Sequence, residues 1–185
     1  MPERTPREAM LDSAITLFRE RGVAATSLRD VVAHSGAPRG SIYHHFPGGK
    51  AQLAEEATQR AGEFIGALLQ RLVSGDDPDR AVGSFVDYWS RTLTSTDYRD
   101  GCPVAAAALS EDDTESARAA AGAAFGEWES ALTLALQDHG LPADRAESLA
   151  NLVVCSIEGA LVVARARRSE EPLRRVGAEL RGLLV

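Results

Sequence analysis

The segment from Thr26 to Lys50, TSLRDVVAHSGAPRGSIYHHFPGGK, holds the side chains whose types and spacing best suit contact with a nucleic acid. An arginine can donate two hydrogen bonds to guanine, while Ser, Tyr and His side chains reach bases or phosphates and a glycine permits close approach. The candidates in the second half of the segment are Arg39, Gly40, Ser41, Tyr43, His44 and His45. We expect this group to face the major groove of double-stranded DNA.

Three further residues of this region are candidates for contacts with the DNA backbone. Thr26 and Ser27 stand where a helix is expected to begin, so their hydroxyls and free amides could bind a phosphate. Lys50 stands at the start of the next helix, where a cation opposes the helix dipole, and a DNA phosphate would explain its presence there.

Two short helices are expected to carry these side chains. Ser27 and Asp30 form an S-x-x-D capping pair for the first, which is expected to stop at Gly36 because glycine can take the positive φ of a tight turn. A second helix is expected to begin near Pro38 and to end before Pro47. This arrangement is a helix-turn-helix.

The side chains of the second short helix are expected to divide between an inner and an outer face. Ile42 and Phe46 are four residues apart and therefore lie on the same side of a helix. We expect them to pack inward against Phe18, Leu28 and Val31. The polar neighbours of Ile42 and Phe46 would then face solvent.

Helical periodicity continues to the end of the chain, and no stretch shows the sustained polar and apolar alternation of a strand. The sequence therefore predicts an all-α fold with nine helices in two domains. The expected parts are a helix-turn-helix domain at residues 1–48, a connecting helix at 49–74, and a ligand-binding and dimerisation domain at 75–185.

Composition and charge are compatible with this interpretation. The 185 residues are 44% hydrophobic and 25% charged, as in ordinary globular proteins. The net charge is −7, but residues 1–50 hold seven basic and five acidic side chains, so the acidic excess lies in the rest of the chain. No unbroken apolar run approaches the roughly 18 residues of a membrane span, and the N-terminus lacks a secretory signal. We expect a cytoplasmic protein without a membrane partner.

The N-terminal segment resembles the DNA-binding domain of the TetR family of bacterial repressors. The matching residues are Ala14, Phe18, Gly22, Thr26, Arg29, Asp30, Val31, Gly36, the run from Arg39 to Phe46, Lys50 and Leu53. Residues 36–50, together with 101–106, are similar to the LmrA/YxaF-like subgroup. One departure is Val32, where the family commonly has a small alanine.

The resemblance implies a homodimer built on the last two long helices, a ligand cavity in the C-terminal domain, and repression that a small ligand releases. By position it implies phosphate contacts for Thr26, Tyr43 and Lys50. It implies contacts with bases or the adjacent backbone for Arg29, Arg39, Ser41 and His44, whereas His45 could make either kind of contact. It also suggests a planar aromatic effector.

An apolar pocket with a few polar groups is the usual composition of a ligand site. Aromatic residues make up only 5% of the chain, and several of them fall in the C-terminal region. The candidate pocket residues are Phe64, Phe85, Tyr88, Trp89, Cys102, Phe125, Trp128 and Cys155. Taken one at a time, each of them is better explained as an ordinary core position.

Two apolar helical stripes near the C-terminus suggest a four-helix dimer interface, because together they exceed what one small bundle must bury. The candidate interface residues are Leu149, Val153, Ile157, Ala160, Leu161, Ala164, Val176 and Leu180. The alternative for the first stripe is an internal core helix.

Other classes of function have less support in the sequence. We find no nucleophile with a base, no paired catalytic carboxylates and no phosphate loop, so an enzyme is not expected. Adjacent histidines such as His44 and His45 point away from each other on a helix, so neither a metal nor a cofactor is expected. A redox role for Cys102 and a non-specific architectural DNA binder are weaker alternatives. The function favoured is a ligand-responsive transcriptional regulator that binds a palindromic operator as a dimer.

Overall fold

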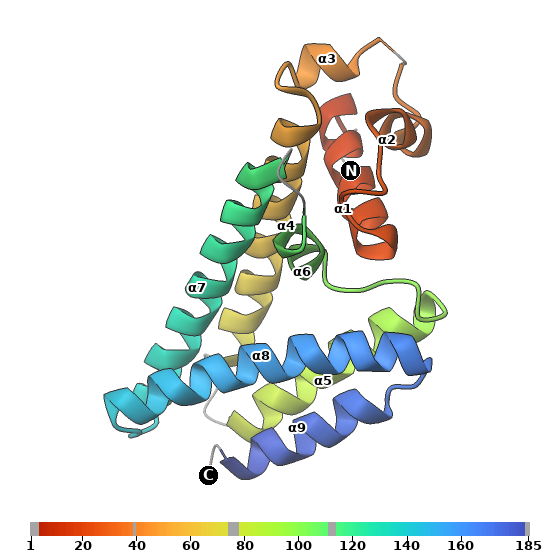
Figure 1. Cartoon of the computed structure of the whole chain (residues 1–185). Coiled ribbons are helices and arrows are strands. Elements are labelled where there is room, and N and C mark those ends of the chain that lie inside the picture. The colour runs from red at the N-terminus through yellow and green to blue at the C-terminus, as the bar shows by residue number, and fades with distance from the viewer. Residues whose placement is uncertain (1–3, 39, 74–77, 111–113, 184–185) are drawn as a thin grey trace. The chain divides into compact units, whose positions relative to one another are not determined.

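The computed structural model describes residues 4–38, 40–73, 78–110 and 114–183, and the regular secondary structure in these ranges is entirely helical (Figure 1). Nine α-helices, α1 to α9, follow one another in these ranges, so the predicted all-α class is confirmed. The chain divides into two compact units. Unit 1 comprises residues 1–62 and 102–123, and unit 2 comprises residues 63–101 and 124–185.

Unit 1 contains α1 (Pro6–Arg21), α2 (Leu28–Ser35), α3 (Ile42–His45) and α6 (Pro103–Ala108), together with the first part of α4 (Gly49–Val73) and of α7 (Glu115–Asp138). α1 packs against α2, α3 and α6. The buried side chains of its core include Met10, Leu11, Ala14, Phe18, Val31, Ile42, Phe46, Leu53 and Val104.

The ends of the first two helices follow from local side-chain chemistry. The side chain of Thr5 accepts a hydrogen bond from the backbone of Glu8, and Ser27 with Asp30 forms the predicted capping box of α2. Gly36, with φ of 70°, ends α2 in the left-handed conformation, as the sequence predicted.

Helix α3 is shorter than predicted, because it begins at Ile42 and not near Pro38. The carbonyl of Pro38 accepts hydrogen bonds from both the backbone amide of Ser41 at 2.9 Å and its hydroxyl at 2.7 Å. A serine side chain that bonds to nearby backbone in this way stabilises a turn in competition with a helix. Gly40 favours the same outcome, since glycine has low helix propensity.

Unit 2 contains α5 (Pro78–Ser95), α8 (Ala143–Arg167) and α9 (Glu171–Leu183), together with the last part of α4 and of α7. α9 packs against both α5 and α8. Its contact with α5 is close, because a methyl group added at Gly177 would lie 2.6 Å from Cγ2 of Val86. The core includes Leu69, Trp89, Leu93, Leu149, Ile157, Leu161, Leu173 and Leu180.

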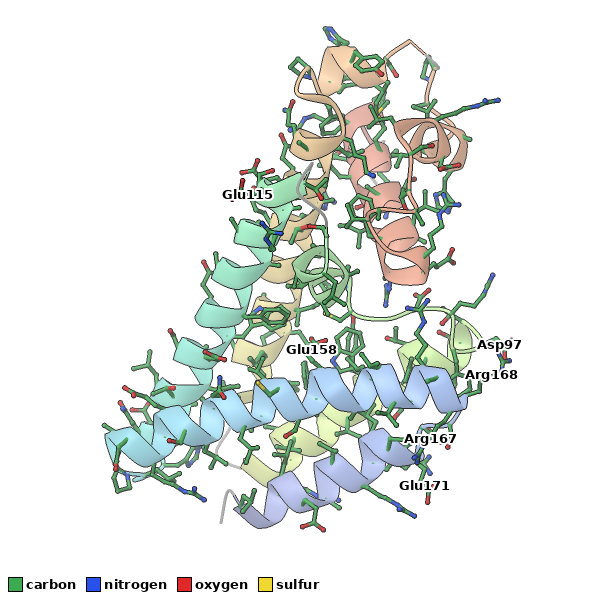
Figure 2. The ribbon with its side chains drawn as sticks, in the orientation of Figure 1. Asp97, Glu115, Glu158, Arg167, Arg168 and Glu171 are labelled. Atoms are coloured by element: carbon green, nitrogen blue, oxygen red, sulfur yellow. The ribbon has the colours of Figure 1, made fainter. Side chains whose placement is uncertain are left out.

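An ion pair joins two loops of unit 2. The guanidinium of Arg168, which ends α8, lies 2.5 Å from the carboxylate of Asp97, which follows α5 (Figure 2). The hydrogen bond and the positive charge of Arg168 hold the pKa of Asp97 below its ordinary value. Asp97, Tyr98 and Arg168 all have positive φ, so this ion pair connects two backbone turns that L-residues rarely adopt.

Helix α8 is the one helix in the described ranges that is long and apolar enough to cross a membrane by length and composition alone. Polar residues such as Ser156 and Glu158 interrupt its apolar stretches, so the sequence contains no unbroken apolar run there. Of its most apolar window, 39% is buried inside the structure. A core helix passes the same test, so the feature to be explained is the apolar surface that α8 leaves exposed.

Candidate functional site

The side chains of α3 divide between two faces as the sequence predicted. Ile42 and Phe46 are buried in the core of unit 1 with Phe18 and Val31. Tyr43 has 65% of its surface exposed, and His44 is also exposed. The inner face of α3 is therefore occupied by its own unit, and its outer face is free to contact another molecule.

A groove lies between α2 and the segment that leads into α3. Its volume is about 510 Å³, and its walls are both polar and apolar. The residues that line it are Leu28, Arg29, Val32, Ala33, Gly36, Ala37, Ile42 and Tyr43. Two predicted contact residues, Arg29 and Tyr43, therefore share one concave surface. Val32, the departure from the family pattern, also contributes to this wall.

Four further predicted contact residues do not line this groove, and they differ in exposure. Gly40 and His44 are exposed, whereas Ser41 and His45 are half-buried. The rings of His44 and His45 lie 5.1 Å apart in an edge-to-face arrangement. No cluster of three or more metal-binding side chains occurs in the part of the chain that the structure describes. Arg39, the predicted base-contacting arginine, lies outside the described residues.

Lys50 lies on the first turn of α4, as predicted, with its side chain half-buried. Its ammonium donates a hydrogen bond to the carbonyl of Ala24 at 3.2 Å, which holds the charge beside the start of α2. An ammonium carries three donors, so this bond leaves Lys50 able to donate to a phosphate as well.

Thr26 does not offer the free hydroxyl and amide that the sequence analysis expected. Its side chain is buried, its hydroxyl donates to the carbonyl of Gly22 at 2.8 Å, and its amide donates to the carbonyl of Val23 at 3.1 Å. The geometry gives Thr26 a structural role in the turn before α2.

Ser27 is exposed and caps α2. Neither its hydroxyl proton nor its amide is free for a phosphate, contrary to the prediction, because both donate to the carboxylate of Asp30, at 2.7 and 2.9 Å. The hydroxyl also accepts a hydrogen bond from the Asp30 amide. These hydrogen bonds, with a smaller contribution from Arg21 at 3.3 Å, hold the pKa of Asp30 below its ordinary value. The one carboxylate of α2 is thus engaged by donors of its own unit.

The predicted ligand residues are only partly brought together. Phe64, Phe85, Tyr88 and Trp89 form one aromatic cluster, in which neighbouring ring centroids lie 5.2 to 6.5 Å apart. Phe125 and Trp128 form a separate edge-to-face pair at 5.2 Å. Cys102 belongs to unit 1, and Cys155 is exposed on α8.

Unit 2 also contains a small, partly open apolar cavity of about 50 Å³. Phe85 is the one predicted ligand residue among those that line it, and His139 is the one ionisable residue in its wall. The lining is Leu69, Leu72, Val73, Ala81, Val82, Phe85, Leu132, Ala135, Leu136, His139, Val153, Ile157 and Leu180. Sites for small molecules usually measure about 300 Å³ or more, so this cavity would have to widen to hold one.

The predicted dimer residues of α8 are buried inside unit 2. This applies to Leu149, Val153, Ile157, Ala160, Leu161 and Ala164, as well as to Leu180 of α9, whereas Val176 is half-buried. A different stripe of the same helix is exposed, namely Leu152, Cys155, Gly159, Val162, Val163 and Ala166. Each member lies three or four residues from another member, and Val162 and Val163 are the i+3 and i+4 neighbours of Gly159, so the set shares one face of α8. We call this set the α8 stripe.

Comparisons with known proteins agree at both ends of the chain. Residues 10–57 match the bacterial regulatory proteins of the tetR family, and residues 78–179 match the C-terminal domain of LmrA/YxaF-like transcriptional regulators. The HTH-type transcriptional regulator Rv0196 of Mycobacterium tuberculosis is 41% identical over 97% of this chain and 94% of its own length. The HTH-type transcriptional regulator LmrA of Bacillus subtilis is 32% identical over 96% of each chain.

A solved structure of the TetR family transcriptional regulator CifR, a cysteine mutant complexed with a 26-base-pair operator DNA, shares the fold. It has a TM-score of 0.80 and 25% identity, and the alignment covers 98% of each chain.

Proposed function

Because the chain belongs to the TetR family, and to its LmrA/YxaF-like subgroup, we propose that it is a repressor that binds a palindromic operator as a homodimer and is released by a small effector. Members of this family are DNA-binding transcriptional regulators and not enzymes, so DNA binding is the premise from which the proposal proceeds. The proposal concerns the assembly, the direction of regulation and the residues used. We infer a cytoplasmic location from the DNA target.

The proposed division of labour follows the chain. The DNA-binding domain would be residues 1–48, and the domain that binds the effector and forms the dimer would be residues 75–185. The helix at residues 49–74 would connect these two domains. Helices α4 and α7 each contribute to both compact units, so either helix offers a physical route by which a change in unit 2 reaches unit 1.

The observation that carries the DNA-binding proposal is the division of α3. Its apolar side chains Ile42 and Phe46 are buried, while Tyr43 and His44 are exposed on the opposite face. We propose that this face enters the major groove with Arg29, Gly40, Ser41 and His45, that Tyr43 and Lys50 bind phosphates, and that Ser27 caps α2. Arg39 joins this set on sequence grounds, and Thr26 supports the turn before α2.

The α8 stripe supports the dimer. Val162 is 63% exposed, and the stripe is apolar or small along its whole length, which leaves a helix face that its own unit does not cover. Two copies of such a face pack against each other in a symmetric interface, with Gly159 permitting close approach of the backbones. The same packing accounts for the apolar character of α8 without a membrane. Dimerisation would place two α3 segments about 34 to 36 Å apart, one turn of DNA.

The composition of unit 2 supports a small apolar or aromatic effector. Its described cavity is apolar and is bordered by Phe85, whose ring packs against Trp89 at 6.2 Å. Because the cavity is small, an effector would favour a conformation in which the surrounding helices have moved apart. A few kcal/mol of preference for that conformation would shift the population away from the DNA-binding state.

The test is selection of a binding site from a pool of randomised DNA duplexes by the full-length protein, followed by titration of the selected and scrambled duplexes at moderate salt. We expect an inverted repeat and binding to the selected site at least about 1,000-fold tighter than to scrambled DNA. Equal affinity for both duplexes would contradict the proposal.

A further inference from the structure

A chain of hydrogen bonds runs from α1 across α4 to the turn between α3 and α4. The guanidinium of Arg7 pairs with Oε2 of Glu56, and Oε1 of Glu56 accepts a hydrogen bond from Nε2 of Gln52 at 3.0 Å. Oε1 of Gln52 in turn accepts a hydrogen bond from the backbone amide of Gly48 at 2.8 Å. All four residues lie in unit 1. Both the amide oxygen and the amide nitrogen of Gln52, and both carboxylate oxygens of Glu56, take part in these contacts.

Arg7 also contacts the end of α3 directly. The guanidinium carbon lies 5.1 Å from the centre of the Phe46 ring, a cation–π distance. Phe46 is buried, and its amide donates to the carbonyl of Ile42 at 2.8 Å, which closes the last turn of α3. Arg7 therefore touches the element that precedes the turn and, through Glu56, the element that follows it.

The backbone of the turn is shaped to admit the Gln52 side chain. A methyl group at residue 48 would lie 3.0 Å from Cβ of Gln52 and 3.1 Å from its Oε1, so a larger residue there would require the Gln52 side chain to shift by a few tenths of an ångström. Gly49 follows with φ of +67°, a conformation that favours glycine. The turn separates Tyr43 and His44 from Lys50, so its geometry sets the spacing between the proposed groove contacts and the proposed phosphate contact.

We propose that Arg7, Gln52 and Glu56 are positioning residues for operator binding: they lock the α3–α4 turn to α1 and thereby fix the orientation of the α3 face relative to Lys50. This rests on the proposed docking of that face on DNA. Binding sites require their contact groups to be held within a fraction of an ångström, and α3, with a single turn, cannot supply that rigidity alone. Sequence patterns do not reveal the chain, because Arg7 and Glu56 are 49 residues apart.

The test compares Gln52→Ala with Gln59→Ala in the full-length protein, using the duplex that the wild-type protein selects from a randomised pool. Gln59 is a matched control because it lies on the same helix and its amide bonds to a neighbouring carboxylate, Glu55 at 3.4 Å, but it is exposed and does not reach the turn. We expect Gln52→Ala, which removes the hydrogen bonds to both Gly48 and Glu56, to weaken binding about fivefold to tenfold, and Gln59→Ala to leave it unchanged.

Salt dependence separates positioning from direct contact. A residue that binds a phosphate contributes about 0.9 to the slope of log affinity against log salt concentration, so Lys50→Ala should reduce that slope by about 1. Gln52→Ala should leave the slope at the wild-type value while the affinity falls. A reduced slope would overturn the positioning role, because it would show that Gln52 itself contacts DNA.

Arg7→Lys provides a second variant that keeps the charge but loses the planar guanidinium that both pairs with Glu56 and stacks on Phe46. We expect it to weaken operator binding, and the double variant with Gln52→Ala to be weakened by less than the product of the two single effects. If both single variants bind the operator with wild-type affinity, the positioning role is wrong, but the proposed function is unaffected. A wild-type protein that selects no duplex would overturn the proposed function instead.

Discussion

The outer face of α3 and the outer face of α8 are both uncovered by their own units, but they are opposite in chemistry. Tyr43 and His44 on α3 are polar and aromatic, whereas the α8 stripe is apolar or small from Leu152 to Ala166. A polar face that includes histidine and tyrosine suits a hydrated, charged duplex, and an apolar face suits a second copy of the same protein. The exposed face of each helix, more than its buried face, therefore indicates its partner.

The largest effect is expected from a charge placed in the α8 stripe. Val162→Asp should convert the dimer to a monomer, because an unpaired carboxylate would be buried at the interface. Loss of the second α3 should weaken operator binding by about 100-fold or more. Light scattering coupled to size-exclusion chromatography gives the mass, and titration of the selected duplex gives the affinity.

Leu134→Asp is the matched control for that experiment. Leu134 of α7 has the same exposed fraction as Val162, 63%, but lies outside the stripe. We expect this variant to remain a dimer with wild-type affinity. A Val162→Asp protein that stays dimeric would show that the α8 stripe is not the face that contacts a second copy of the protein.

The next effect concerns the buried face of α9. Gly177→Ala should destabilise the protein by about 1 to 3 kcal/mol, because the added methyl group meets Val86 at 2.6 Å. Gly182→Ala, on the same helix with no atom within 4 Å, should not destabilise it. Urea unfolding monitored by circular dichroism measures both. Equal stability of the two variants would mean that α9 and α5 pack less closely than described.

A smaller effect is expected on the outer face of α3. Tyr43→Phe removes a hydroxyl from an exposed ring and should weaken binding to the selected and the scrambled duplex alike, by about fivefold, with no change in melting temperature. Titration of both duplexes checks it. A loss confined to the selected duplex would reassign Tyr43 from phosphate to base contact.

The smallest effect concerns pH and the cap of α2. Because the pKa of Asp30 is lowered in the folded protein, its stabilising contribution is complete above its ordinary value of 3.8 and is lost as the pH falls below that value. Ser27→Ala removes the main cause of the shift. The difference in melting temperature between wild type and Ser27→Ala should therefore be largest near neutral pH and should narrow below pH 3.8. A difference independent of pH would contradict this cause.

Local chemistry made much of unit 1 predictable from the sequence. The cap at Ser27, the glycine at the end of α2 and the alternation of Ile42, Tyr43 and Phe46 each depend on residues within a few positions of one another. The predicted start of α3 was wrong, because the Ser41 hydroxyl donates a hydrogen bond to the carbonyl of Pro38 and stabilises a turn there. Helix propensity alone does not show whether such a turn or a helix forms.

Apolar residues were harder to place because an apolar side chain suits both a core and an interface. Leu149 and Ile157 were expected at the dimer interface, yet they are buried within unit 2, and their exposed neighbours Leu152 and Val162 were not singled out. A helix that is apolar around most of its circumference gives no periodic signal to distinguish its faces. Contacts between residues far apart in the chain, such as Arg7 with Glu56, leave no local pattern.

Hydrogen–deuterium exchange of the full-length protein, alone and with the selected duplex, tests the central claim most directly. We predict that peptides spanning α2, α3 and the start of α4 gain protection with the selected duplex and much less with scrambled DNA. Unchanged exchange in these peptides, with protection appearing only elsewhere in the chain, would contradict the assignment of the α3 face to DNA.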